Sequence, residues 1–191
     1  MHMNVYELIL KRRTIRKFRQ DKIERSVLEK LINAARYAPS ASNMQPIKYI
    51  IVEEPEKVEK VFQNVKWAAY IAPEGDPKEG EKPVAFIIIL VDTEIKDSYY
   101  ELDIGAAAQN IFLTALEEGI GTCWMGAINR DEIRSIFRIP ERYIINTVIA
   151  LGYIGENPIA EDETGSIRYY KDKDGVLHVP KRKLEDIILK V

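Results

Sequence analysis

The sequence predicts an α+β fold, in which a mixed, largely antiparallel β-sheet is flanked by helices. Apolar, β-branched runs of strand length alternate irregularly with segments whose apolar residues recur at helical spacing. The chain has 191 residues and 46% hydrophobic content, enough to bury one sizeable core, and it shows no internal repeat or disordered linker. We therefore expect a single domain over residues 1–191.

The N-terminal half is expected to contain helices and strands in turn. Val5, Leu8 and Ile9 recur at helical spacing, and the β-branched Thr14 and Ile15 after them favour an extended backbone. Apolar residues also recur at helical spacing over 28–35, and residues 84–91 are an unbroken apolar run. In order, the predicted elements are a helix over 4–11, an extended segment over 12–16, a helix over 28–35, a strand over 47–54, a helix over 55–71 and a strand over 84–92.

Two loops interrupt this half. "APSASNMQP" at 38–46 has two prolines and short polar residues, which are typical of an ordered loop. "PEGDPKEGEK" at 73–82 is charged and punctuated by Gly and Pro, so we expect a surface loop of the kind that acts as a lid.

The C-terminal half begins with a helix that is apolar on nearly every side. Small residues in "IGAAA" at 104–108 allow another backbone to approach closely, and one subunit can hardly cover such a helix. In order, the predicted elements are a helix over 101–118, a strand over 121–128, a helix over 130–137, a strand over 143–155, a hairpin over 167–179 that turns at Asp174-Gly175, and a helix over 181–190.

Composition limits the class of partner. The formal net charge of −2 and the pI near 5.9 argue against general attraction to nucleic acid or to an anionic membrane. The longest apolar run has eight residues, against the ~20 that span a bilayer, and no apolar segment follows the N-terminus. Cys123, His2 and His178 do not have the spacing of zinc ligands, so no metal site is expected. These features predict a soluble, cytoplasmic protein.

Residues 11–19, "KRRTIRKFR", place six cations in nine positions. Along an extended backbone Arg12, Thr14 and Arg16 share one face, so two guanidinium groups and a hydroxyl can converge on one ligand. Such a set suits a phosphate ester. A solvated helix end explains the same cluster without a ligand, because cations stabilise helix C-termini. The residues alone leave both interpretations open.

The sequence offers no convincing catalytic acid, base or nucleophile. It contains no complete dinucleotide fingerprint and no phosphate loop. The carboxylates of Asp92, Asp103 and Glu117 do not form a catalytic pair by spacing, and neither Ser40 nor Cys123 has a nearby histidine. Asp103 is unexpected in so apolar a helix start, although a helix N-terminus tolerates an acidic residue. If the protein is an enzyme, a cofactor carries the chemistry.

Five motifs in combination resemble the flavin-dependent nitroreductase family. They are "RRTIRKF" at 12–18, "APSASNMQP" at 38–46, "DIGAAAQN" at 103–110, "GIGTCWMGAI" at 119–128 and "HVPKRKLEDI" at 178–187. The motifs follow the family's order and span nearly the whole chain. The resemblance implies an FMN-binding homodimer with each flavin in the cleft between subunits and with exchanged terminal segments. It also implies that NADH or NADPH gives a hydride to flavin N5, and that two electrons pass to a small acceptor such as a nitroaromatic or a quinone.

The resemblance assigns the phosphate end of FMN to two parts of the chain. Arg12 and Thr14 match residues at the phosphate and ribityl end, and Arg13 lies beside them. Lys181 and Arg182 match a C-terminal pair that completes the phosphate site, and the alignment leaves open which of the two reaches it.

The resemblance also assigns the ring end. Arg16 matches a cation near the flavin pyrimidine edge, where positive charge stabilises the anionic reduced flavin. Asn64 and Lys66 lie where the family often places a further contact. The turn whose backbone approaches flavin N5 is matched by Met125, Gly126 and Ala127. The loop that lines the flavin from the other subunit is matched by Pro39, Ser40, Ala41, Asn43 and Gln45.

Two other functions stay open at this point. Relatives with this fold act on the flavin itself or reduce another conjugated or halogenated ring. The second alternative belongs to a different class of function: a nucleic-acid-binding module that uses the basic segment at 11–19. Such a module needs cations spread over one face, which this sequence lacks.

Overall fold

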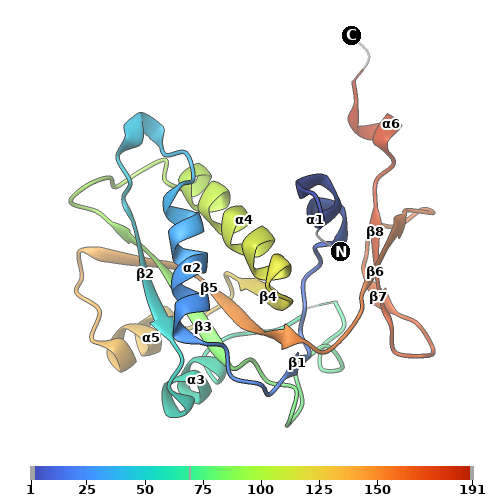
Figure 1. The fold of residues 1–191 in the computed structure, drawn as a ribbon, viewed down its shortest axis with the longest axis horizontal. Helices are drawn as coiled ribbons and strands as arrows, with labels where there is room; N and C mark the ends of the chain where they lie inside the picture. Colours follow the sequence, from blue (N-terminus) through green and yellow to red (C-terminus); the bar gives the residue numbers. More distant parts are fainter. Residues whose placement is uncertain (1–2, 69, 190–191) are drawn as a thin grey trace.

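The structure, a computed structural model, describes residues 3–68 and 70–189. In this part of the chain five strands form an antiparallel sheet with helices on both faces, and three more strands form a small separate sheet (Figure 1). The helices are α1 (Val5–Lys11), α2 (Arg25–Arg36), the 3₁₀ helix η1 (Ala41–Asn43), α3 (Pro55–Phe62), α4 (Glu101–Glu117), α5 (Arg130–Phe137) and α6 (Leu184–Ile187). The strands are β1 (Phe18–Arg19), β2 (Ile47–Val52), β3 (Ala85–Asp92), β4 (Ile120–Met125), β5 (Tyr143–Ile154), β6 (Ile159–Asp162), β7 (Tyr170–Lys171) and β8 (Leu177–Lys181). The predicted α+β class is confirmed.

The larger sheet has the order β1-β5-β3-β2, and β4 pairs with β5 as well. Every residue of β3 is buried, and its side chains alternate between two apolar clusters. Phe86 and Ile88 belong to the cluster that includes side chains of α3 and α5, whereas Ile87 and Ile89 belong to the cluster with α2 and α4. Because both faces of the strand are covered, its sequence is a continuous apolar run without polar alternation.

Local signals set the first helix as predicted. The Asn4 side chain accepts the N–H of Glu7 at 3.0 Å, and the Glu7 carboxylate accepts the N–H of Asn4 at 2.9 Å. This capping box satisfies two backbone donors at the helix start. None of the helices in the described ranges is long and apolar enough to cross a membrane.

The segment after α1, residues 12–19, is called the N-terminal arm here, and it lies across β4 and β5 at very short range. A Cβ atom on Gly121 would lie 2.7 Å from Cβ of Ile15, and a Cβ atom on Gly152 would lie 2.7 Å from Cβ of Phe18. Contacts that short do not occur between real side chains. Glycine at these two positions therefore allows the arm to approach the sheet.

Backbone hydrogen bonds hold the arm in this place. The N–H of Ile15 donates to the carbonyl of Thr122 at 3.0 Å, and Thr14 forms an isolated parallel bridge with Thr122. The N–H of Gly155 donates to the carbonyl of Lys17 at 2.9 Å. The arm is extended, as predicted, and it also contains β1, a two-residue strand that the sequence analysis did not predict.

The helix predicted over 55–71 is too long, because α3 ends at its second turn. The N–H of Lys66 donates to the carbonyl of Ala127 at 2.9 Å, and the N–H of Asn129 donates to the carbonyl of Asn64 at 2.9 Å. These bonds pair the chain after α3 with the chain after β4. A backbone that pairs in this way cannot continue as a helix.

The C-terminal hairpin is confirmed, since β7 pairs antiparallel with β8 and the chain turns at Asp172–Gly175. β6, which was not predicted, pairs parallel with β8. Figure 1 shows this small sheet beside α1, with α6 beyond it.

The helix predicted over 181–190 is wrong at its start, because Lys181 belongs to β8 and α6 begins at Leu184. Residues 69 and 190 of the predicted helices lie outside the described residues.

His178 joins the three strands of the small sheet. Its Nδ1 lies 2.9 Å from a Glu161 oxygen and its Nε2 lies 3.2 Å from an Asp172 oxygen. Its ring stacks on that of Tyr170 at 4.9 Å between centroids. The hydrogen bonds to Glu161 and then to Asp172 raise the pKa of His178, because a protonated ring can donate to both carboxylates. This contact holds in place the strand that ends at Lys181.

Replacing Gly121 by alanine is expected to lower the free energy of unfolding by about 1–3 kcal/mol, because the new Cβ would overlap Ile15. Denaturant unfolding of the purified protein measures the change. Gly126→Ala is the matched control: its Cβ would meet only Thr147, at 3.9 Å, so its stability should change by less than about 0.5 kcal/mol. Equal effects in the two variants would contradict the role given to Gly121.

Candidate functional site

Three cations gather where the N-terminal arm meets the end of β8: Arg12, Arg13 and Lys181, called the cationic cluster here. Burial lowers the pKa of all three, the charge of Arg12 lowers that of Arg13, and both arginines lower that of Lys181. No carboxylate of the described residues lies within ion-pair distance of any of them. Like charges brought together without a counter-charge raise the free energy, so this cluster is suited to binding an anion.

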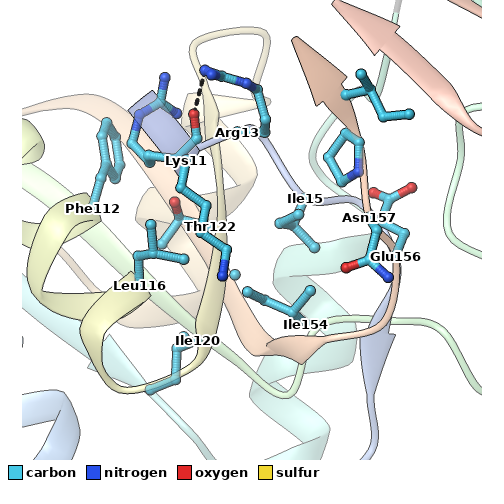
Figure 2. A pocket seen from close by; sticks show the side chains of 14 residues that line it. Lys11, Arg13, Ile15, Phe112, Leu116, Ile120, Thr122, Ile154, Glu156 and Asn157 are labelled. Atoms are coloured by element: carbon cyan, nitrogen blue, oxygen red, sulfur yellow. Dashed lines mark hydrogen bonds between the residues drawn. The ribbon is translucent and has the colours of Figure 1, made fainter. Parts of the chain in front are cut away.

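An apolar hollow of about 240 Å³ lies beside the cluster. Figure 2 shows Lys11 and Arg13 along one side of it, with Phe112 and Leu116 of α4 and Ile154 of β5 on the others. The guanidinium of Arg12 lies 5.8 Å from the centre of the Phe112 ring. An aromatic face attracts a cation without taking its hydrogen-bond donors.

A second hollow, of about 600 Å³, is called the ring pocket here. It is formed by Arg16 of the arm, the segment after α3, the end of β4 and the segment before β7. The residues that line it are Arg16, Val65, Lys66, Trp67, Ala68, Ala72, Asp76, Cys123, Trp124, Met125, Gly126, Ala127 and Tyr169. Its volume and its aromatic walls suit a planar ring system.

Two polar atoms at the ring pocket are buried without a hydrogen-bond partner among the described residues: Nε of Arg16 and Nε1 of Trp67. Both are obligatory donors, and a buried donor without an acceptor costs about 1–3 kcal/mol. They are suited to the carbonyl oxygens and ring nitrogens of a bound heterocycle. The Cys123 thiol at this wall is not a nucleophile, because burial raises its pKa to about 11.

Asp103, unexpected in its sequence context, anchors the loop over residues 39–45, called the Ser40 loop here. Its carboxylate accepts the Ser40 hydroxyl at 3.1 Å, the Ala41 N–H at 3.1 Å and the Lys96 ammonium at 3.0 Å. The side chains of Asp103 and Lys96 are 5% and 10% exposed. Burial would raise the pKa of Asp103, but the bonds from Lys96, Ala41 and Ser40 together lower it. A charged, buried carboxylate therefore fixes the loop to the first turn of α4.

The Ser40 loop has a strained backbone. Ser42, Asn43 and Gln45 all have positive φ, at 53°, 54° and 53°. Such conformations cost on the order of 1–3 kcal/mol each in non-glycine residues, so the surrounding contacts must maintain them. The Ser40 hydroxyl does so from within the loop, since it accepts the N–H of Gln45 at 3.0 Å while it donates to Asp103.

The structure brings some of the expected site residues together and keeps others apart. Arg12 and Arg16 line different hollows at the two ends of the arm, so they can share one ligand only if that ligand is long enough to reach both. Lys66 lies in the ring pocket, whereas the Asn64 side chain bonds to the carbonyl of Lys60 and lies outside it. Lys181 lies close enough to Arg12 and Arg13 for their charges to lower its pKa, in addition to the effect of burial. Thr14 is half-buried between the two hollows.

The Ser40 loop does not reach the ring pocket of its own chain. Asp103, its anchor, and Phe112, beside Arg12, are nine residues apart on α4, which corresponds to about 13 Å. Pro39, Ser40 and Gln45 line a separate hollow at the start of α4, and Ala41 and Asn43 are exposed. Figure 1 shows this loop and α1 toward opposite ends of α4.

Sequence reasoning missed Trp67, Tyr169 and Lys96. Trp67 directly follows Lys66, which the family resemblance had placed near a further flavin contact. That resemblance was the one sequence feature that pointed toward Trp67. Tyr169 contacts Arg16, which is far away in the sequence, and Lys96 contacts Asp103, seven residues further along; no periodic pattern marks either residue. From the loop expected to act as a lid, Asp76 lines the ring pocket.

The chain is similar to known proteins in sequence and in fold. A family model described as the Nitroreductase family matches residues 9–153. A Methanothermobacter thermautotrophicus protein named NADH dehydrogenase/NAD(P)H nitroreductase is 32% identical over 177 residues, which cover 90% of this chain and 88% of that protein. The structure of a nitroreductase family protein from Clostridium novyi NT has a TM-score of 0.68 at 31% identity, covering 80% of this chain and 86% of its own. An FMN-dependent nitroreductase from Clostridium difficile R20291 has a TM-score of 0.64 at 27% identity, covering 87% and 92%.

Asp103→Asn is expected to lower the free energy of unfolding by about 3–5 kcal/mol, because it leaves the buried Lys96 ammonium without its counter-charge. The double variant Asp103→Asn/Lys96→Met should recover part of the loss. Because hydrogen bonds lower the folded-state pKa of Asp103, its contribution is present above about pH 4 and is lost as the pH falls through the folded value. Urea unfolding at several pH values measures both effects, and an unchanged Asp103→Asn midpoint would contradict the anchor.

Proposed function

Because this chain belongs to the nitroreductase family, we propose that it is an oxidoreductase that uses FMN to pass reducing equivalents from NADH or NADPH to a small acceptor such as a nitroaromatic or a quinone. The observation that carries the proposal is the pairing of an anion site with a ring site. The cationic cluster and the ring pocket lie at the two ends of one extended arm. The cluster has no carboxylate of the described residues within ion-pair distance, and the ring pocket has two buried donors without a partner among those residues. FMN has a phosphate at one end and a planar heterocycle at the other.

The phosphate would be held by Arg12, Arg13 and Lys181. A dianionic phosphate removes the repulsion that now lowers the pKa values of Arg13 and Lys181. Charge-assisted bonds from arginine to phosphate are among the strongest in proteins. Of the two C-terminal candidates, Lys181 is supported by its position beside both arginines.

The ring would be held by Arg16 and Trp67, with Lys66 at the same wall. Bound FMN would supply the redox chemistry, accepting a hydride and releasing two electrons to the acceptor. The chain would then position the ring and polarise it. The fixed charge of Arg16 favours extra negative charge on a ring beside it. Met125, Gly126 and Ala127 present main chain and small side chains at the pocket, so donor and acceptor can approach the ring in turn.

We also propose that the protein is a homodimer and that the Ser40 loop lines the ring pocket of the second subunit. α4 has a partly uncovered face at helical spacing, which consists of Leu102, Gly105, Ala106, Gln109 and Leu113. Leu102 is 84% exposed, and α1 exposes Val5, Tyr6, Ile9 and Leu10 beside α4. A strained, well-anchored loop that does not reach the ring pocket of its own chain is suited to line the ring pocket of a neighbour.

The purified protein is expected to be yellow, or to bind FMN in a titration of flavin fluorescence. Arg12→Ala should weaken FMN binding about ten- to a hundredfold, because it removes a charge-assisted bond to the phosphate worth roughly 1.5–3 kcal/mol. Arg19→Ala is the matched control: this arginine of the same basic segment is exposed and pairs with Asp21 at 3.2 Å, so its loss should leave FMN affinity unchanged. A wild-type protein that binds no FMN, or equal affinities in all three proteins, would contradict the proposal.

The FMN-free protein is expected to have a mass of about twice 22.0 kDa by light scattering, with more than ~2,000 Å² buried between subunits. Leu102→Glu should weaken the dimer, since it places a charge on the uncovered face of α4. FMN should raise the melting temperature and oppose dissociation, by about 2.7 kcal/mol at a hundred times its Kd. A 22.0 kDa monomer that holds FMN tightly would show instead that one chain completes the site.

A further inference from the structure

Arg16 belongs to a cluster of two arginines and two tyrosines beside the ring pocket. Its guanidinium carbon lies 5.3 Å from the centre of the Tyr169 ring, and the Tyr169 ring packs at a tilted angle against that of Tyr70, with 4.9 Å between centroids. The guanidinium of Arg168 lies 4.9 Å from the centre of the Tyr70 ring. The cluster joins the N-terminal arm, the loop after α3 and the segment before β7, which are far apart in the sequence.

Glu156 contacts the backbone of Arg16 but does not pair with its guanidinium. One oxygen of the Glu156 carboxylate accepts two backbone N–H groups, from Arg16 at 2.5 Å and from Lys17 at 3.2 Å. Nε of Arg16 is buried and has no acceptor among the described residues. Tyr169 is the aromatic face on which this guanidinium lies, and cation–π attraction leaves the N–H donors free.

We propose that Tyr169 is a positioning residue for Arg16: its ring holds the guanidinium at the wall of the ring pocket while the Nε–H stays free for the cofactor. This inference rests on the proposed function, because it gives Arg16 a flavin ring to act on. Tyr70 supports the arrangement, since its ring packs at a tilted angle against that of Tyr169 and its backbone N–H donates to the Tyr169 hydroxyl at 3.4 Å. Tyr169 lies beyond residues 9–153, the part of the chain that the family model matches.

The consequence concerns both the affinity and the potential of the bound flavin. Without the Tyr169 ring, the guanidinium can turn toward Glu156 or solvent, and its donors then have to be reoriented when the ring binds. The flavin would bind less tightly. The reduced, negatively charged flavin would lose more than the oxidised one, so the midpoint potential should become more negative.

The test compares three variants by FMN titration and by the midpoint potential of the bound flavin against reference dyes. Tyr169→Leu should weaken FMN binding about two- to thirtyfold, the range that a cation–π contact covers, and shift the potential to more negative values. Tyr169→Phe keeps the ring and should behave like the wild type. Tyr153→Leu is the matched control, because Arg19 lies 5.3 Å from the Tyr153 ring in an equivalent contact away from the ring pocket.

A double variant separates positioning from packing. In an Arg16→Met background, Tyr169→Leu should change neither FMN affinity nor potential further, because the residue it positions is already absent. An additive loss would overturn the inference, since Tyr169 would then act independently of Arg16. A Tyr169→Leu protein with wild-type affinity and potential would overturn it as well while leaving the proposed function intact. A wild-type protein that binds no FMN would overturn both.

Discussion

The site depends on how closely the N-terminal arm approaches the sheet. Gly121 and Gly152 have no Cβ atoms, so Ile15 and Phe18 can lie directly on β4 and β5 at distances that any other residue would block. That contact fixes an extended segment in which Arg12 and Arg16 are four residues apart, or about 13 Å. One end of the arm then lies beside Lys181 of the small sheet and the other lies in the ring pocket. The close approach of the arm to the sheet therefore positions arginines at both the cationic cluster and the ring pocket.

The basic segment at 11–19 contains cations of two kinds. Lys17 and Arg19 form surface ion pairs with Glu81 and Asp21, so the solvated-face interpretation is correct for them. Such exposed pairs contribute little to stability. Arg12 and Arg16 lie against aromatic faces, those of Phe112 and Tyr169, and neither pairs with a carboxylate of the described residues. The proposed ligand is therefore assigned to these two arginines, whose charge the described part of the chain leaves without an anion.

α4 connects the features that the proposed dimer needs. Its first turn carries Asp103, which holds the strained Ser40 loop, and a later turn carries Phe112, which lies under Arg12. The face of α4 that carries Leu102 and Gly105 is only partly covered by the described part of the chain. A helix that is apolar on most sides can pack against α2 and β4 on one side and against a second subunit on the other.

The sequence by itself determined the α+β class, the helices α1, α4 and α5, four of the five strands of the main sheet and the terminal hairpin, because helical spacing, capping and apolar runs are local signals. The five motifs identified the family, which the family model confirms. Tertiary structure decided the rest. α3 ends early because the chain after it pairs with residues beyond β4, and β6 and β1 exist only through strands distant in sequence. Asp103 and Tyr169 contact Ser40 and Arg16, which lie many residues away, and a contact between distant segments leaves no periodic trace in either one.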